Sequence, residues 1–144
     1  MKYLAPKTTK EAVALMAKAK HPAFVLAGGT DLMVAIKNDF IEPAIVVDIK
    51  KIPAMRTIRK SATGFRIGAG VTAAEMAEHR ELSKAWPGVV ESAGLIGSDQ
   101  IQNRCTVAGN LCNASPAADS VPALIAAGAK VRIVGPKGSR TIPV

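Results

Sequence analysis

Aromatic residues are scarce in this chain of 144 residues: Phe, Trp and Tyr together account for only 3% of it. Its hydrophobic residues, 49% of the chain, must therefore build a core mainly from Ala, Val, Ile and Leu. The shortage also removes an obvious surface on which nucleic-acid bases could stack. Charged residues make up 21%, which is typical of a globular protein and argues against general disorder.

Long hydrophobic runs are absent as well. The longest uncharged stretch, residues 105–118, is too short to span a bilayer and contains Gly, Asn, Ser and Pro. Lys2 is not followed by the apolar segment of a secretory signal peptide, because the short apolar run at 12–17 leads directly into Lys18 and Lys20. We therefore expect a cytoplasmic protein without a membrane span.

Residues that usually carry side-chain catalysis or bind metals are few and scattered. The two cysteines, Cys105 and Cys112, match neither a C-x-x-C motif nor a disulfide framework, and we expect buried thiols. His21 precedes a proline, and His79 stands between two charged residues on an expected charged helix face. Ser92, Ser98, Ser115 and Ser120 have no nearby histidine that would activate them. The sequence predicts no catalytic side chain and no metal site.

Acidic residues are outnumbered, because 19 Lys and Arg against 11 Asp and Glu leave a formal net charge of +8. Taken alone, this charge suggests nucleic acid, an anionic ligand or an acidic partner. The basic residues gather, however, at 50–66 and 130–140, and Arg104 is the only one between residues 85 and 129. We therefore expect no phosphate site built from basic side chains in that middle segment. The missing aromatics disfavour nucleic acid.

Strand and helix patterns alternate at the start of the chain. Thr8 and Glu11 have the spacing of a capping box, which predicts a helix N-terminus. The apolar run at residues 44–49 has the continuous hydrophobicity of a strand buried on both faces of a parallel sheet. The expected elements are strands at 2–5, 23–26 and 44–49 and helices at 8–20 and 32–38. Together they predict a small α/β domain over residues 1–52.

The remaining residues, 53–144, mix hairpin and helix patterns. Thr72 and Glu75 form a second capping-box pattern. Residues 101–116 have no clean period and are expected to form an ordered, ligand-lining loop. The other expected elements are a hairpin over 56–59 and 65–69, helices at 89–96 and 121–127, and strands at 130–134 and 140–144. The fold class is therefore predicted as α+β, with a second domain at 53–144.

The glycine turn at residues 27–31 has the composition of an anion site. A turn between a strand and a helix exposes backbone N–H groups, and Gly28 and Gly29 would let a phosphate or pyrophosphate approach them closely. Thr30 could donate its hydroxyl, and Asp31 could cap the following helix. An ordinary turn into a capped helix explains the same residues. Neither G-x-G-x-x-G nor G-K-[ST] is present, which excludes the common Rossmann and Walker motifs.

A second candidate segment covers residues 106–119, which are rich in small polar side chains. Asn110, Asn113 and Ser115 could hydrogen-bond the edge of a heterocycle. Asp119 stands just before a predicted helix, so capping that helix and binding a ribose hydroxyl are both open roles.

The two candidate segments together resemble a known family. Residues 26–32 are Leu-Ala-Gly-Gly-Thr-Asp-Leu, residues 96–111 are Ile-Gly-Ser-Asp-Gln-Ile-Gln-Asn-Arg-Cys-Thr-Val-Ala-Gly-Asn-Leu, and residues 114–119 are Ala-Ser-Pro-Ala-Ala-Asp. These motifs resemble the FAD-binding medium subunit of the molybdenum hydroxylases, the group of xanthine dehydrogenase and carbon monoxide dehydrogenase. The resemblance covers essentially the whole chain and implies the two-subdomain FAD-binding fold that is also seen in relatives of vanillyl-alcohol oxidase.

The resemblance also implies a site for FAD. Residues 26–32 would wrap the pyrophosphate through their backbone, residues 106–110 would form a second wall, Asp119 would hold the ribose or adenine end, and Ile96 would add an apolar contact. The implied binding residues are Leu26, Ala27, Gly28, Gly29, Thr30, Asp31, Leu32, Ile96, Thr106, Ala108, Gly109, Asn110 and Asp119. Two positions depart from the family pattern, since Gln102 replaces an arginine and Ala108 replaces a glycine.

By the same resemblance, the chain is an oxidoreductase flavoprotein subunit without catalytic side chains of its own. Its partners would be a 2Fe-2S small subunit and a molybdenum-cofactor large subunit, and FAD would pass electrons from iron–sulfur clusters to an acceptor. Because members of the family continue beyond this point, we expect a second domain that is incomplete at its C-terminus. A truncated scaffold or partner-docking module that does not bind FAD alone is the alternative. A basic anion or nucleic-acid binder, suggested by charge alone, is a third possibility.

Overall fold

A parallel three-stranded sheet organises the N-terminal part of the computed structural model, which describes all residues 1–144. Its strands are β1 (Lys2–Leu4), β2 (Ala23–Leu26) and β3 (Ile45–Asp48), in the order β1-β3-β2. Both outer strands run parallel to β3. Val46, Val47 and Asp48 of this central strand are buried, which confirms the strand predicted at 44–49.

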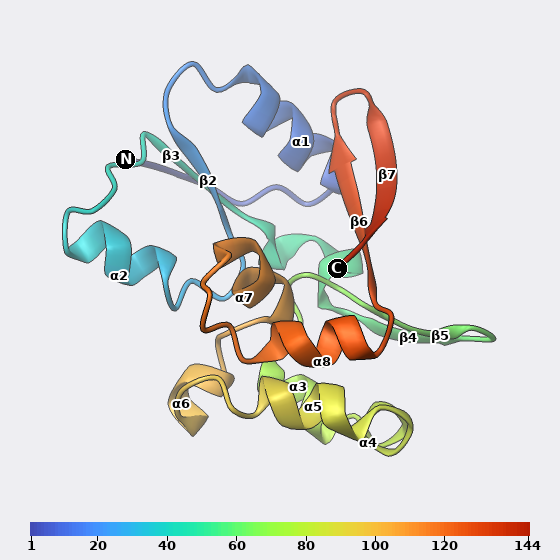
Figure 1. The fold of residues 1–144 in the computed structure, drawn as a ribbon. Coiled ribbons are helices and arrows are strands. Elements are labelled where there is room, and N and C mark those ends of the chain that lie inside the picture. The colour runs from blue at the N-terminus through green and yellow to red at the C-terminus, as the bar shows by residue number, and fades with distance from the viewer.

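Helices α1 (Thr9–Lys18) and α2 (Leu32–Lys37) lie on opposite sides of this sheet (Figure 1). The Thr8 hydroxyl accepts from the Glu11 backbone N–H at 3.1 Å, as the capping-box pattern predicts. The Glu11 carboxylate, however, accepts from the backbone N–H of Lys7 at 2.9 Å, one residue before the cap. The side of α1 that faces the sheet joins a small hydrophobic cluster, whose buried members are Ala12, Val47, Ile49 and Ile52.

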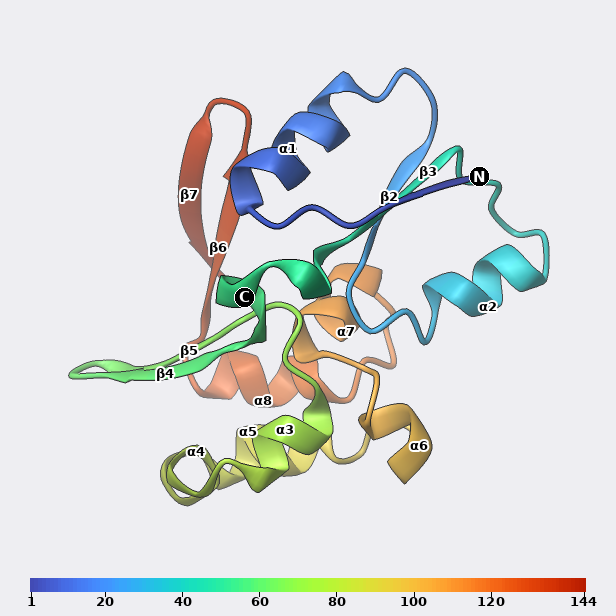
Figure 2. The ribbon, with the colours of Figure 1, turned by 180° about the vertical axis from the view of Figure 1, so that it is seen from behind.

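Two short 3-10 helices, η1 (Ile49–Lys51) and η2 (Pro53–Arg56), lead from the sheet to a hairpin of β4 (Ile58–Ser61) and β5 (Gly64–Ile67). The hairpin confirms the antiparallel pair predicted from the sequence and projects from the body of the molecule (Figure 2). Its apolar face, formed by Ile58, Phe65 and Ile67, packs against the larger hydrophobic cluster.

Most of the remaining chain is helical and gathers below the sheet (Figure 1). The helices are α3 (Ala73–Glu78), α4 (Arg80–Ala85), α5 (Pro87–Ala93), α6 (Asp99–Gln102), α7 (Val107–Asn113) and α8 (Ser120–Ala126). At the start of α3, the Thr72 hydroxyl accepts from the Glu75 backbone N–H and the Glu75 carboxylate accepts from the Thr72 N–H. This capping box is complete, as predicted. Met76, Leu82 and Ala93 lie at the centre of a cluster of 11 buried residues that joins α3, α4, α5, α7 and α8.

Two sequence predictions in this part were wrong. Residues 101–116 were expected to be irregular, but α6 ends and all of α7 lies within them. Small polar residues and Gly109 hid this helix, because they give neither helical periodicity nor high helix propensity. His79 does not lie on a charged helix face: it separates α3 from α4, and its Nδ1 accepts from the Leu82 N–H at 3.2 Å. Its ring also meets Phe65 edge-on, with centroids 5.9 Å apart.

The chain ends in a second hairpin, β6 (Lys130–Gly135) and β7 (Gly138–Pro143), which stands beside α1 (Figure 1). It confirms both predicted strands and completes a mixed α+β architecture. The division into domains at 1–52 and 53–144 stays a prediction. None of the helices combines the length and the hydrophobicity that crossing a membrane requires.

Candidate functional site

A large cavity lies where the sheet meets the helical part. Its volume is about 650 Å³, within the range of roughly 300–1,000 Å³ typical of small-molecule sites. One wall is the glycine turn that follows β2, and the other is the segment that enters α7. The two segments singled out in the sequence, almost eighty residues apart, therefore face each other across one space.

Five consecutive backbone N–H groups on the first wall, those of Gly28 to Leu32, donate no hydrogen bond within the chain. Gly28 is buried, so its N–H has little access to bulk water. Buried backbone donors are normally paired, so the Gly28 N–H needs an acceptor from outside the chain, and the N–H groups that follow it at the start of α2 are free to bind the same acceptor. The Asp31 side chain stands at the N-cap position of α2 but makes no capping hydrogen bond, and the prediction that it caps the helix was wrong.

Gly28 brings the two walls into direct contact. A Cβ atom at this position would lie 2.3 Å from the Arg104 carbonyl oxygen and 2.8 Å from the Cys105 Cα. Only a residue without a side chain can pack there without displacing the backbone. The next residue, Gly29, has a φ of +84°, which side-chain-bearing residues rarely adopt. The two glycines therefore serve different needs, a close approach and a left-handed turn.

The second wall satisfies more of its own backbone. The Thr106 hydroxyl accepts from the Gly109 N–H at 2.9 Å and so caps α7. The Asn110 side-chain oxygen accepts from the Ser120 hydroxyl at 2.6 Å, which links α7 to α8. Asn110 thus uses its carbonyl oxygen inside the protein, and only its amide N–H groups are left for a ligand.

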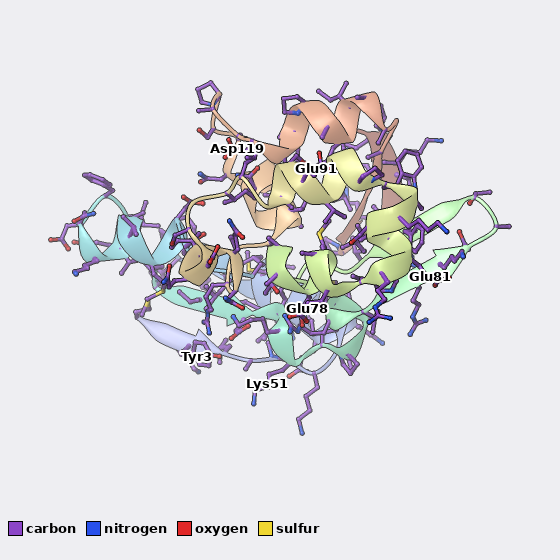
Figure 3. All side chains as sticks on the ribbon, turned by 90° about the horizontal axis from the view of Figure 1, so that it is seen from below. Tyr3, Lys51, Glu78, Glu81, Glu91 and Asp119 are labelled. Atoms are coloured by element: carbon purple, nitrogen blue, oxygen red, sulfur yellow. The ribbon has the colours of Figure 1, made fainter.

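Of the 13 residues that the sequence predicted for the site, 11 line the cavity; Leu26 and Asp119 do not. The Leu26 side chain packs against Gly29 instead, where a Cβ atom on Gly29 would meet its Cδ1 atom at 2.6 Å. Asp119 is exposed, makes no capping hydrogen bond to α8, and lies on the opposite side of the molecule from Tyr3 in Figure 3. A role for Asp119 at the ribose or adenine end stays a prediction.

Sequence reasoning missed several apolar lining residues. Apart from Cys105, which lies inside the 96–111 motif, they belong to no motif, so only the fold brings them to the cavity. The additional lining residues are Phe24, Val25, Ala35, Ile41, Ile49, Ala69, Cys105 and Cys112. Asn113, which the sequence analysis named for the edge of a heterocycle, lines the cavity as well.

The cavity is apolar and poor in positive charge. No Lys or Arg lines it, and Asp31 is its one charged residue. An anion held here would depend on backbone N–H groups.

The two cysteines of the cavity differ in exposure. Cys105 is buried, and burial raises the pKa of its thiol. Cys112 is exposed, contrary to the expectation of two buried thiols.

Comparison of the sequence with known protein families shows which family the chain belongs to. The sequence profile described as "FAD binding domain in molybdopterin dehydrogenase" matches residues 1–144, the whole chain. The chain belongs to this family. The match agrees with the resemblance seen in the two motifs.

Similar proteins carry related names. The chain is 35% identical over 141 residues to the carbon monoxide dehydrogenase medium chain of Hydrogenophaga pseudoflava, covering 98% of this chain and 49% of that protein. It is 34% identical to the nicotinate dehydrogenase FAD-subunit of Eubacterium barkeri, covering 96% of this chain and 47% of that one. A solved structure of the Hydrogenophaga enzyme superposes with a TM-score of 0.95 at 34% identity, over 99% of this chain and 50% of that chain. The chain thus spans about half the length of these relatives.

The residues of the cavity fit FAD. A dinucleotide needs hydrogen-bond donors for its pyrophosphate, and the unpaired N–H groups of residues 28–32 would supply them without a basic side chain. Its ring systems need apolar contacts, which Ile41, Ile49 and Ile96 supply. At Gly28 the absence of a side chain lets the two walls pack against each other beside the cavity.

Proposed function

We propose that this chain binds FAD in the cavity between residues 27–32 and 105–113 and serves as the flavoprotein part of a molybdenum-containing dehydrogenase. The observation that carries this proposal is the run of five unpaired backbone N–H groups at the head of an apolar cavity. The family match over the whole chain supports it independently.

The tasks of the chain in this function are binding and orientation. The N–H groups of Gly28 to Leu32 would hold the pyrophosphate. On the other wall, the Thr106 hydroxyl caps α7 and so stabilises the start of this helix. Ala108, where the family pattern has glycine, lines the cavity and narrows it by one methyl group. Ile96, which is buried, would make an apolar contact with a ring of the cofactor. Bound FAD would supply the redox chemistry.

We further propose that the chain works in a complex. Its relatives include a "medium chain" and FAD subunits of dehydrogenases, and the motif resemblance implies a 2Fe-2S small subunit and a molybdenum-cofactor large subunit as partners. Substrate oxidation would then take place on a partner chain, and the flavin would receive electrons through iron–sulfur clusters. The charge of +8 suits acidic partner surfaces.

Titration of the purified chain with FAD, followed by flavin fluorescence, tests the proposal. Saturable quenching, with a flavin absorption spectrum that remains after gel filtration, is the expected result. FMN and ADP are matched controls, since each lacks one half of the dinucleotide. A folded chain that binds neither FAD nor either half would contradict the proposal and favour the alternative, a docking module that does not bind FAD alone.

A further inference from the structure

Asp48, the last residue of β3, is the one buried charged residue of the chain, with 5% of its surface exposed. Its carboxylate has three partners. Oδ2 accepts from the Tyr3 hydroxyl at 2.5 Å, and Oδ1 accepts from both the backbone N–H and the side-chain Nζ of Lys50 at 2.9 Å. A buried carboxylate is costly unless it is paired in this way, so the arrangement holds all three residues in one geometry.

Lys50 also reaches the glycine turn. Its Nζ donates to the carbonyl oxygen of Ala27 at 2.9 Å. The sheet explains this contact, because β2 and β3 are parallel neighbours in which Leu26 pairs with Asp48. Both strands therefore end at the same edge, and the residues that follow them lie side by side.

The bond to Ala27 fixes a peptide group at the start of the first wall. A trans peptide is planar, and its N–H points opposite to its C=O. Holding the Ala27 carbonyl toward Lys50 therefore directs the Gly28 N–H away from Lys50. Lys50 itself does not line the cavity, whereas Gly28 does. The lysine can reach a ligand only through this backbone.

We propose that Lys50, held by Asp48 and Tyr3, is a positioning residue that orients the N–H groups of the glycine turn for the pyrophosphate of FAD. The inference rests on the proposed function for its ligand, but the geometry it describes belongs to the chain without a ligand. A charged donor on a peptide oxygen also polarises the peptide and strengthens its N–H as a donor.

The ionisation of Asp48 agrees with this role. Burial would raise the pKa of its carboxyl group, but the hydrogen bonds from Tyr3 and Lys50 outweigh burial and hold that pKa below its ordinary value. The carboxylate is therefore charged at neutral pH and available to anchor the Lys50 ammonium group.

Lys50→Met tests the proposal, with Lys51→Met as the matched control. Lys51 is the adjacent lysine, is exposed and forms no ion pair, so both changes remove one positive charge from nearly the same place. Figure 3 places Lys51 and Tyr3 on the same edge of the molecule. Because Lys50→Met leaves Asp48 buried without its cation, a second variant, Lys50→Met with Asp48→Asn, removes both charges.

Two readouts are needed. The first is FAD affinity from fluorescence quenching, where we expect Lys50→Met and the double variant to bind about tenfold more weakly, as the loss of a charged hydrogen bond predicts. The second is the order of the backbone N–H groups of Gly28 to Leu32 in the ligand-free chain, from ¹⁵N relaxation and amide exchange. We expect both variants, but not Lys51→Met, to loosen these groups.

The outcomes separate this inference from the proposed function. If the unmodified chain binds no FAD, the proposed function fails, and the amide measurements still decide whether Lys50 orders the turn. Folded Lys50 variants with a turn as ordered as that of the unmodified chain would overturn the inference. Equal loss of affinity in Lys51→Met would overturn it too, because it would show a general effect of charge.

Discussion

The backbones of the two walls of the cavity differ in how far the protein itself satisfies their hydrogen bonds. In the glycine turn, five N–H groups are left unpaired. The side chain of Lys50, in η1 just after β3, holds this turn by donating to the Ala27 carbonyl oxygen. In the segment entering α7, the Thr106 hydroxyl and the Asn110 side chain satisfy groups of the protein itself. Under the proposed function, the first wall would contribute most of the hydrogen-bond donors, and the second would contribute mainly shape. Substitutions in the two walls should therefore separate binding from stability.

The largest expected difference is between Gly28→Ala and Gly109→Ala. At Gly28 the new Cβ would meet backbone atoms at 2.3 and 2.8 Å, which cannot yield without moving one wall. We expect a loss of about 1–3 kcal/mol in the free energy of unfolding and of most FAD affinity. At Gly109 the new Cβ would meet only the Thr106 Oγ1, at 2.9 Å, so we expect a loss of less than about 1 kcal/mol. Urea unfolding and FAD titration of both variants measure the difference, and equal effects would break the comparison.

A second contrast lies in the two helix N-termini. Thr106→Ala removes a cap that is present and should lower the free energy of unfolding by about 1 kcal/mol. Asp31→Ala removes a side chain that makes no capping bond and should change the free energy of unfolding by less than about 0.5 kcal/mol. Urea unfolding curves with a common slope would show this order. A larger loss for Asp31→Ala would mean that α2 depends on its carboxylate.

Acid should affect the chain through Asp48. Its pKa is lower in the folded chain than the ordinary value of 3.8, because the hydrogen bonds from Tyr3 and Lys50 outweigh the opposing effect of burial. The stabilisation is therefore present above about pH 4 and is lost as the pH falls through the lower, folded value. Unfolding measured at pH 7, 4 and 3 should show this loss, and Asp48→Asn should lose about 1–3 kcal/mol at pH 7 but show a weaker acid dependence. If the free energy of unfolding depends on pH in the same way in the unmodified chain and in Asp48→Asn, the acid sensitivity does not come from Asp48.

The smallest effect on stability is expected for Asp119→Ala. Asp119 is exposed and does not cap α8, so its removal should leave the melting temperature within about 2 °C. If Asp119 holds the ribose or adenine end, FAD affinity should fall while affinity for FMN, which lacks that end, does not change. Loss of both affinities, or of neither, would remove Asp119 from the site.

Sequence patterns predicted the elements that depend on local signals. The capping residues Thr8 and Thr72 and the apolar run of β3 specify their elements through neighbours in the chain, and these predictions were confirmed. Helix α7 was missed, because its small residues form a helix only when Thr106 caps it and Val107 packs into the core. Local pattern was not enough there.

The candidate site divides in the same manner. Its glycine and Thr106 motifs could be found in the sequence, and 11 of the 13 predicted residues line the cavity. The Tyr3, Asp48 and Lys50 network could not be found, since its Tyr3–Asp48 bond joins residues 45 positions apart and its bond to Ala27 spans 23. These contacts follow from strand order and register, which the sequence pattern does not state.

The central claim is that the unpaired N–H groups of Gly28 to Leu32 hold the pyrophosphate of FAD, and a ¹H–¹⁵N spectrum recorded during an FAD titration tests it most directly. The account predicts large downfield shifts of the Gly28, Gly29 and Thr30 amide protons, smaller shifts at Ala108 and Gly109, and none in the β4–β5 hairpin. Saturable FAD binding that leaves the amide protons of the glycine turn unshifted would contradict it.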